Sequence, residues 1–137
     1  MRNTVVAVDS GLFVALFNRG DTHHPRAVEF SDECRAEFIS NMACVTEAMY
    51  LLQFHHGAQY DFLNWVQKGS VKLIEPTLAD FGRVNELMKK YSDLPMDFTD
   101  ALLVSICERL DVQQVATVDS DFEIYRFKGR GRFVNLF

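Results

Sequence analysis

The sequence predicts an α/β fold in which helices cover both faces of a mostly parallel sheet. Short apolar and β-branched runs, typical of buried strands, alternate with longer segments in which apolar residues recur every three or four positions, typical of helices. Strands that alternate with helices pair in parallel through helical crossovers. The chain has 137 residues and no repeat or Pro/Gly/Ser-rich linker, so we expect a single domain over residues 1–137.

The first half of the chain is expected to contain two strands and four helices. Residues 4–8 are a short β-branched run, and a helix over residues 11–17 opens directly after Asp9 and Ser10. Turn-forming residues follow. Beyond them we expect a helix at residues 26–36, a short strand at 37–40, and helices at 45–54 and 58–67.

The second half is expected to contain three strands and two helices. A strand at residues 71–74 is ended by Pro76. The spacing of the apolar residues predicts a further helix. Its expected buried face consists of Phe81, Val84, Met88 and Tyr91. The same signal predicts a helix at residues 98–110, and short apolar runs predict strands at 115–118 and 133–136.

Composition and charge narrow the classes of function. The chain carries 14 Lys and Arg against 19 Asp and Glu, which argues against non-specific nucleic-acid binding because that requires a basic surface. An enzyme that reaches phosphates through metal ions is still compatible with this charge. The longest apolar run, residues 12–17, is far shorter than the roughly 20 residues that cross a bilayer, so we expect no membrane contact. The 3 cysteines are widely spaced, which favours buried thiols and a cytoplasmic protein.

Four acidic residues lie where an α/β sheet places its chemistry. Asp9 closes the first expected strand and Asp119 the fourth, and such sheets bind ligands beyond the carboxyl ends of their strands. Glu47 and Asp100 lie near the starts of two strongly apolar helices. Carboxylates that converge repel one another, and the usual compensation is a hard cation such as Mg²⁺ or Mn²⁺. The sequence therefore predicts a cation site.

Three of these four positions, Asp9, Glu47 and Asp100, also have a structural interpretation. Asp9 can cap the following helix, although Ser10 can do so equally well and would leave Asp9 free. Glu47 could simply complement the helix dipole. Asp97 and Asp100 fit a capping box, with Asp97 as the N-cap and Asp100 reaching back to it.

Other polar residues fit a supporting role around the acids. Asp121 could do no more than shape the loop after Asp119, and the hydroxyl of Thr117 could lie near the same place. The expected auxiliary residues are Ser10, Asp97, Thr117 and Asp121. A basic series could contact phosphates or form a solvated edge, and it consists of Arg126, Lys128, Arg130 and Arg132. The 12 phenylalanines exceed what the core periodicity accommodates, so some should line a dimer face or a groove for a partner helix.

Four segments carry a family resemblance, and in chain order they are VDSGLFVAL, TEAMYLL, PMDFTDALLVSICERL and ATVDSDF. Together they resemble the PIN-domain family, especially the toxin ribonucleases of VapBC toxin–antitoxin pairs, over essentially the whole chain. The resemblance implies a Rossmann-like three-layer α/β/α sandwich and cleavage of RNA that depends on Mg²⁺ or Mn²⁺. It also implies a homodimer and an antitoxin partner whose tail occupies the active-site groove. By motif position, the residues that resemble the family's catalytic acids are Asp9, Glu47, Asp100 and Asp119, with Asp97 and Asp121 as auxiliary acids.

Our hypothesis for the mechanism assigns a role to each acid. Asp9 and Asp100 hold the principal Mg²⁺, Asp119 supports it, and Glu47 orders a water molecule or a second ion. The metal would lower the pKa of a bound water and neutralise charge on the attacked phosphate. The resemblance implies products with a 5′-phosphate and a 3′-hydroxyl.

Other functions stay open at this point. The same fold could serve RNA processing or RNA binding without an antitoxin. A phosphoacceptor receiver domain also gathers acids around Mg²⁺, but it requires an acceptor aspartate after the third strand, where this chain has Ile74, Glu75 and Pro76. A dinucleotide-binding enzyme is not supported, because no Gly-rich turn follows the first strand.

Overall fold

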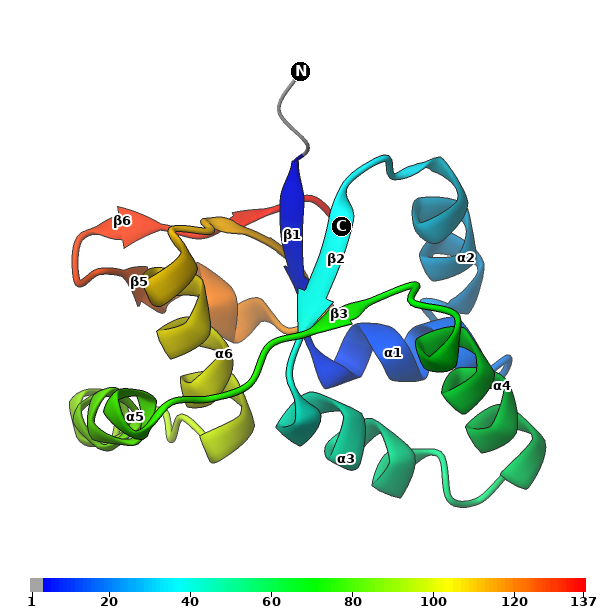
Figure 1. Ribbon diagram of the computed structural model, residues 1–137, viewed down its shortest axis with the longest axis horizontal. Coiled ribbons are helices and arrows are strands. Elements are labelled where there is room, and N and C mark those ends of the chain that lie inside the picture. Colours follow the sequence, from blue (N-terminus) through cyan, green and yellow to red (C-terminus); the bar gives the residue numbers. More distant parts are fainter. Residues whose placement is uncertain (1–3) are drawn as a thin grey trace.

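The computed structural model describes residues 4–137 and is built around a five-stranded sheet in the order β3-β2-β1-β4-β7 (Figure 1). Every pairing in this sheet is parallel. Its strands are β1 (Val5–Val8), β2 (Glu37–Ser40), β3 (Lys72–Leu73), β4 (Gln114–Ala116) and β7 (Val134–Asn135). The predicted parallel sheet is therefore confirmed, with β3, β4 and β7 shorter than expected.

Helices cover the sheet on both sides, as predicted. They are α1 (Ser10–Phe17), α2 (His24–Glu33), α3 (Met42–Leu51), α4 (His56–Gln67), α5 (Leu78–Lys90) and α6 (Phe98–Leu110). In Figure 1, α1, α2 and α4 lie to the right of the strands, and α5 and α6 lie to the left. Helix α3 contacts both α1 and α6, so it joins the two helical layers below the carboxyl ends of the strands.

Capping residues explain where several helices begin. Helix α3 starts earlier than predicted because the side chain of Asn41, directly after β2, accepts the N–H of Cys44 (3.0 Å). Pro25, which precedes the helix expected at residues 26–36, lies in the first turn of α2, where its missing N–H costs nothing. Thr77 and Asp80 form a capping box at the start of α5.

The buried face of α5 differs from the prediction. Val84 and Leu87 are buried, whereas Phe81 and Met88 are 51% and 39% exposed. The prediction that Phe81 and Met88 point into the core is therefore wrong. The buried stripe also contains Asp80, which the spacing of apolar residues alone does not reveal.

Asp80 is a structural acid that joins α5 to α6. It accepts hydrogen bonds from Ser105 (2.8 Å) and Arg109 (3.1 Å) and completes the cap at Thr77. Burial acts to raise the pKa of Asp80, but these bonds and the charge of Arg109 outweigh it and hold the pKa below its usual value.

A short segment between β4 and β7 was not predicted. It contains a 3₁₀ helix η1 (Ser120–Glu123) and an antiparallel hairpin of β5 (Arg126–Phe127) and β6 (Gly131–Arg132). The hairpin turn has positive φ at Lys128 (52°) and Gly129 (77°), a conformation that suits glycine. Within the basic series, Arg126 donates to backbone carbonyls around η1, and Lys128 forms an ion pair with Asp111.

The core takes up many of the phenylalanines. Phe13, Phe17 and Phe62 pack around Trp65 on the α1 side of the sheet. Phe54 and Phe98 stay 65% and 42% exposed, consistent with the expected surplus over the core. Over residues 4–137, no helix combines the length and the apolar character needed to span a bilayer.

Candidate active site

The carboxyl ends of β1 and β4 bring the first and last predicted acids to one edge of the sheet. These strands are parallel neighbours, with Val8 beside Ala116, so Asp9 and Asp119 leave the sheet at the same edge. Gly11 allows the start of α1 to approach Val118 closely, because a Cβ at this position would lie 3.0 Å from the side chain of Val118.

Asp9 is buried, with 4% exposure, and both of its oxygens have partners. Oδ1 accepts the N–H of Leu12 (3.1 Å), and Oδ2 accepts the hydroxyl of Thr117, whose oxygen in turn accepts the N–H of Asp119 (2.9 Å). Of the two possible caps, it is therefore Asp9 and not Ser10 that caps α1. Burial raises the pKa of Asp9 to about 6, in spite of these bonds and with a contribution from Asp119 and Glu47.

Glu47 is held by hydroxyl groups from two other helices. Ser10, the first residue of α1, donates to Oε1, and Thr99 in α6 donates to Oε2 (3.2 Å). Ser10, one of the expected auxiliary residues, thus lies against Glu47. Thr99 was not predicted, and its only sequence signal is its place directly before Asp100.

Asp97 and Asp100 form the start of α6. Asp97 accepts the N–H of Asp100 (2.9 Å), which confirms it as the N-cap. The carboxylate of Asp100 does not complete a capping box. Instead its Oδ2 accepts the hydroxyl of Tyr125 (3.1 Å), a residue that sequence reasoning missed. Burial, followed by the charges of Asp97, Asp119 and Asp9, raises the pKa of Asp100 to about 8.

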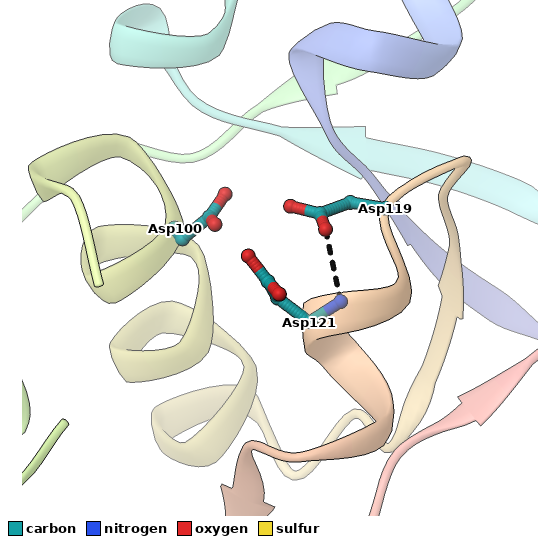
Figure 2. A group of neighbouring side chains, drawn as sticks. All are labelled: Asp100, Asp119 and Asp121. Atoms are coloured by element: carbon teal, nitrogen blue, oxygen red, sulfur yellow. Dashed lines mark hydrogen bonds between the residues drawn. The ribbon is translucent and has the colours of Figure 1, made fainter. Parts of the chain in front are cut away.

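Three carboxylates converge in front of this edge, as Figure 2 shows. Asp100, Asp119 and Asp121 each offer an oxygen, and these oxygens lie within 4.8 Å of one another. Oδ1 of Asp119 also accepts the N–H of Asp121 (2.9 Å). Burial and the charge of Asp119 raise the pKa of Asp121. Asp121, expected only to support the site, therefore belongs to the central group, while Asp9 lies outside this group of three.

The donor set fits a hard divalent cation. All three groups are carboxylates, the ligands that Mg²⁺ and Mn²⁺ prefer. Over residues 4–137, no lysine or arginine forms an ion pair with Asp9, Asp100, Asp119 or Asp121. The mutual repulsion of the acids is therefore left for a proton or a bound divalent cation to offset.

Two solved structures have a similar fold. VapC20 of Mycobacterium tuberculosis, a toxin that cleaves the sarcin-ricin loop, aligns with a TM-score of 0.80 over 87% of this chain and 93% of its own, at 20% sequence identity. VapBC2 of Rickettsia felis, bound to a DNA fragment from its promoter, aligns with a TM-score of 0.64 over 93% and 96%, at 10% identity. No family model and no curated protein matches the sequence. The VapC-like PIN-domain fold implied by the sequence resemblance is confirmed.

The strand order also argues against a receiver domain. Receiver domains have the order 2-1-3-4-5. Here β1 lies between β2 and β4, and β3 is at the far edge of the sheet. The structure therefore offers no support for the phosphoacceptor alternative.

Proposed function

We propose that this VapC-like chain is an endoribonuclease that depends on Mg²⁺ or Mn²⁺ and forms one nuclease domain over residues 1–137. The observation that carries the proposal is the convergence of Asp100, Asp119 and Asp121 at the carboxyl edge of a parallel sheet, with no lysine or arginine of residues 4–137 paired to them. The similarity in fold to VapC20 supports RNA as the substrate.

The acids divide into residues that hold the cation and residues that orient them. Asp100, Asp119 and Asp121 would hold the ion. We retain Asp9 as a further ligand, since each of its oxygens accepts one bond from residues 4–137 and keeps a lone pair. A bound Mg²⁺ or Mn²⁺ supplies charge neutralisation at the phosphate and acidifies water.

Glu47 is suited to orient water beside the cation. Ser10 and Thr99 fix both of its oxygens, so that the carboxylate has one preferred orientation. Water, rather than the ribose 2′-hydroxyl, would attack the phosphate, and the products would carry a 5′-phosphate and a 3′-hydroxyl. No histidine takes part in this scheme.

The proposal extends to partners and location. We infer a cognate antitoxin, because the VapBC2 structure is a toxin–antitoxin neighbour of the same fold, and a homodimer through the exposed aromatic side chains. The cytoplasm, where RNA substrates are found, is the proposed location. A small neighbouring reading frame with a DNA-binding start and a helical tail would support the toxin assignment over an RNA-processing enzyme without an antitoxin.

A cleavage assay tests the proposed activity. RNA hairpins that contain the sarcin-ricin loop, together with tRNA, are incubated with wild-type protein in Mn²⁺ or in chelator, and the product ends are identified. We expect cleavage only with metal. Asp100→Asn should lose it, while Asp93→Asn, a change at an exposed loop residue, should not. Cleavage that persists in chelator, or in Asp100→Asn at the wild-type rate, would refute the proposed function.

A further inference from the structure

Tyr125 is a fully buried tyrosine beside the acidic cluster. It follows η1, its N–H donates to the carbonyl of Asp121 (3.1 Å), and its side chain is 1% exposed. Its ring packs edge-on against Tyr91 and Phe122, with centroid distances of 5.2 and 5.1 Å. These contacts fix the ring and therefore the position of its hydroxyl group.

The hydroxyl of Tyr125 is directed at one of the acids. It donates to Oδ2 of Asp100 (3.1 Å), which satisfies a polar group that would be costly to bury alone. Burial, and then the charge of Asp100, raises the pKa of Tyr125, so the phenol stays a donor at neutral pH. The other oxygen of Asp100 remains available to a cation.

This bond connects two elements that carry like charges. Asp100 lies in the first turn of α6, whereas Asp119 and Asp121 lie in the segment that leads directly to Tyr125. Their carboxylates converge within 4.8 Å and repel one another. A neutral donor can hold the two elements together, whereas a lysine or arginine in its place would compete with the cation.

We propose that Tyr125 is a positioning residue of the cation site, whose hydroxyl holds the carboxylate of Asp100 toward Asp119 and Asp121. The proposal rests on the function proposed above, because it concerns the affinity of that site for a divalent ion. Tyr125 acts through Asp100 and makes no contact with substrate in this role.

Tyr125→Phe removes the hydroxyl and keeps the packing of the ring. Asp100 is only partly buried, so water can replace the lost donor and the variant should fold. The matched control is Tyr91→Phe, which removes the hydroxyl that accepts the N–H of Arg126 (3.0 Å) in the adjacent ring. Calorimetric titration with Mn²⁺ should show affinity weakened roughly tenfold or more in Tyr125→Phe, the usual effect of removing a group that orients a metal ligand, and unchanged in Tyr91→Phe. Excess Mn²⁺ should restore RNA cleavage by Tyr125→Phe.

The possible outcomes distinguish a failure of the positioning role of Tyr125 from a failure of the cation site itself. Wild-type Mn²⁺ affinity in Tyr125→Phe, with binding lost in Asp100→Asn, would overturn the positioning role and leave the cation site in place. Equal weakening in both tyrosine variants would also overturn it, because the effect would then not be specific to the hydroxyl that binds Asp100. A wild-type protein that does not bind Mn²⁺ would overturn both proposals.

Discussion

Asp100→Asn should stabilise the metal-free protein while it abolishes cleavage. The carboxylate of Asp100 is partly buried among other acids, and its pKa rises from 3.8 to about 8. A carboxyl group whose pKa is higher in the folded state destabilises that state as the pH rises above the unfolded value, because the unfolded chain then ionises more readily than the folded protein. The penalty is absent below pH 4, grows as the pH rises, and is complete above the folded-state pKa. Asparagine removes the charge and keeps an oxygen that can accept the bond from Tyr125.

The size of this stabilisation follows from the shift in the pKa of Asp100. At pH 7 the folded-state penalty has developed over roughly 3 pH units, an upper bound of about 4 kcal/mol. Solvent screens a partly exposed group, so we expect a gain of about 1–2 kcal/mol in the free energy of unfolding. Saturating Mn²⁺ should make the wild type the more stable of the two proteins. The ion binds the folded wild-type protein and adds about 2.7 kcal/mol to its free energy of unfolding at a hundredfold excess over Kd.

Urea denaturation in chelator at pH 4, 6 and 8 measures this difference. The gain from Asp100→Asn should be near zero at pH 4 and largest at pH 8, and Asp93→Asn should show no such trend. An asparagine variant as stable as the wild type at pH 8, or a gain that is independent of pH, would refute the argument that carboxylate ionisation strains this site.

Three further predictions test other parts of the structure. Thr99→Ala frees one oxygen of Glu47 and should lower kcat for RNA cleavage about tenfold. The circular dichroism spectrum should stay unchanged. An unchanged kcat would contradict the role of Thr99 in orienting Glu47. Asp80→Asn should cost about 1–3 kcal/mol in urea denaturation at pH 7. Because the pKa of Asp80 is lowered, its contribution is complete above a pH of about 4 and disappears in more acidic solution, so the two proteins should converge there. Leu87→Ala should lower the free energy of unfolding by about 2–5 kcal/mol, and Phe81→Ala should lower it much less. A larger loss in Phe81→Ala than in Leu87→Ala would support the buried face predicted from sequence.

Some features of the site could be predicted because they depend on local sequence. Acids that follow strand-like runs lie at the carboxyl edge of a parallel sheet, whatever the rest of the chain does. Asp9 and Asp119 are found there, and Asp97 caps α6 as its neighbours indicated. The resemblance of the motifs also extended to the fold, although no family model matches the chain.

Other features depended on partners that are distant in sequence. Asp9 and Ser10 are equally good caps by local chemistry, and the choice is made by Glu47, which binds the hydroxyl of Ser10 from another helix. In α5, the residues on two adjacent faces of the helix have almost the same spacing. The ion pair of Asp80 with Arg109 determines which of these faces packs against α6. The position of Tyr125 depends on a 3₁₀ turn and a two-residue strand, which are too short to show a period.

The partners of the buried acids distinguish structural carboxylates from the candidate site. Asp80 pairs with an arginine, and its pKa is lowered. Within residues 4–137, Asp9 and Asp100 receive bonds only from a backbone N–H or from the neutral hydroxyls of Thr117 and Tyr125, and their pKa values are raised. Hydroxyl groups orient a carboxylate without cancelling its charge, so the repulsion persists until a proton or a cation offsets it. A fold that needed these acids only for stability would be better served by arginine, as at Asp80. The use of neutral donors at this edge of the sheet is therefore the strongest physical argument that the acids are held for a metal ion.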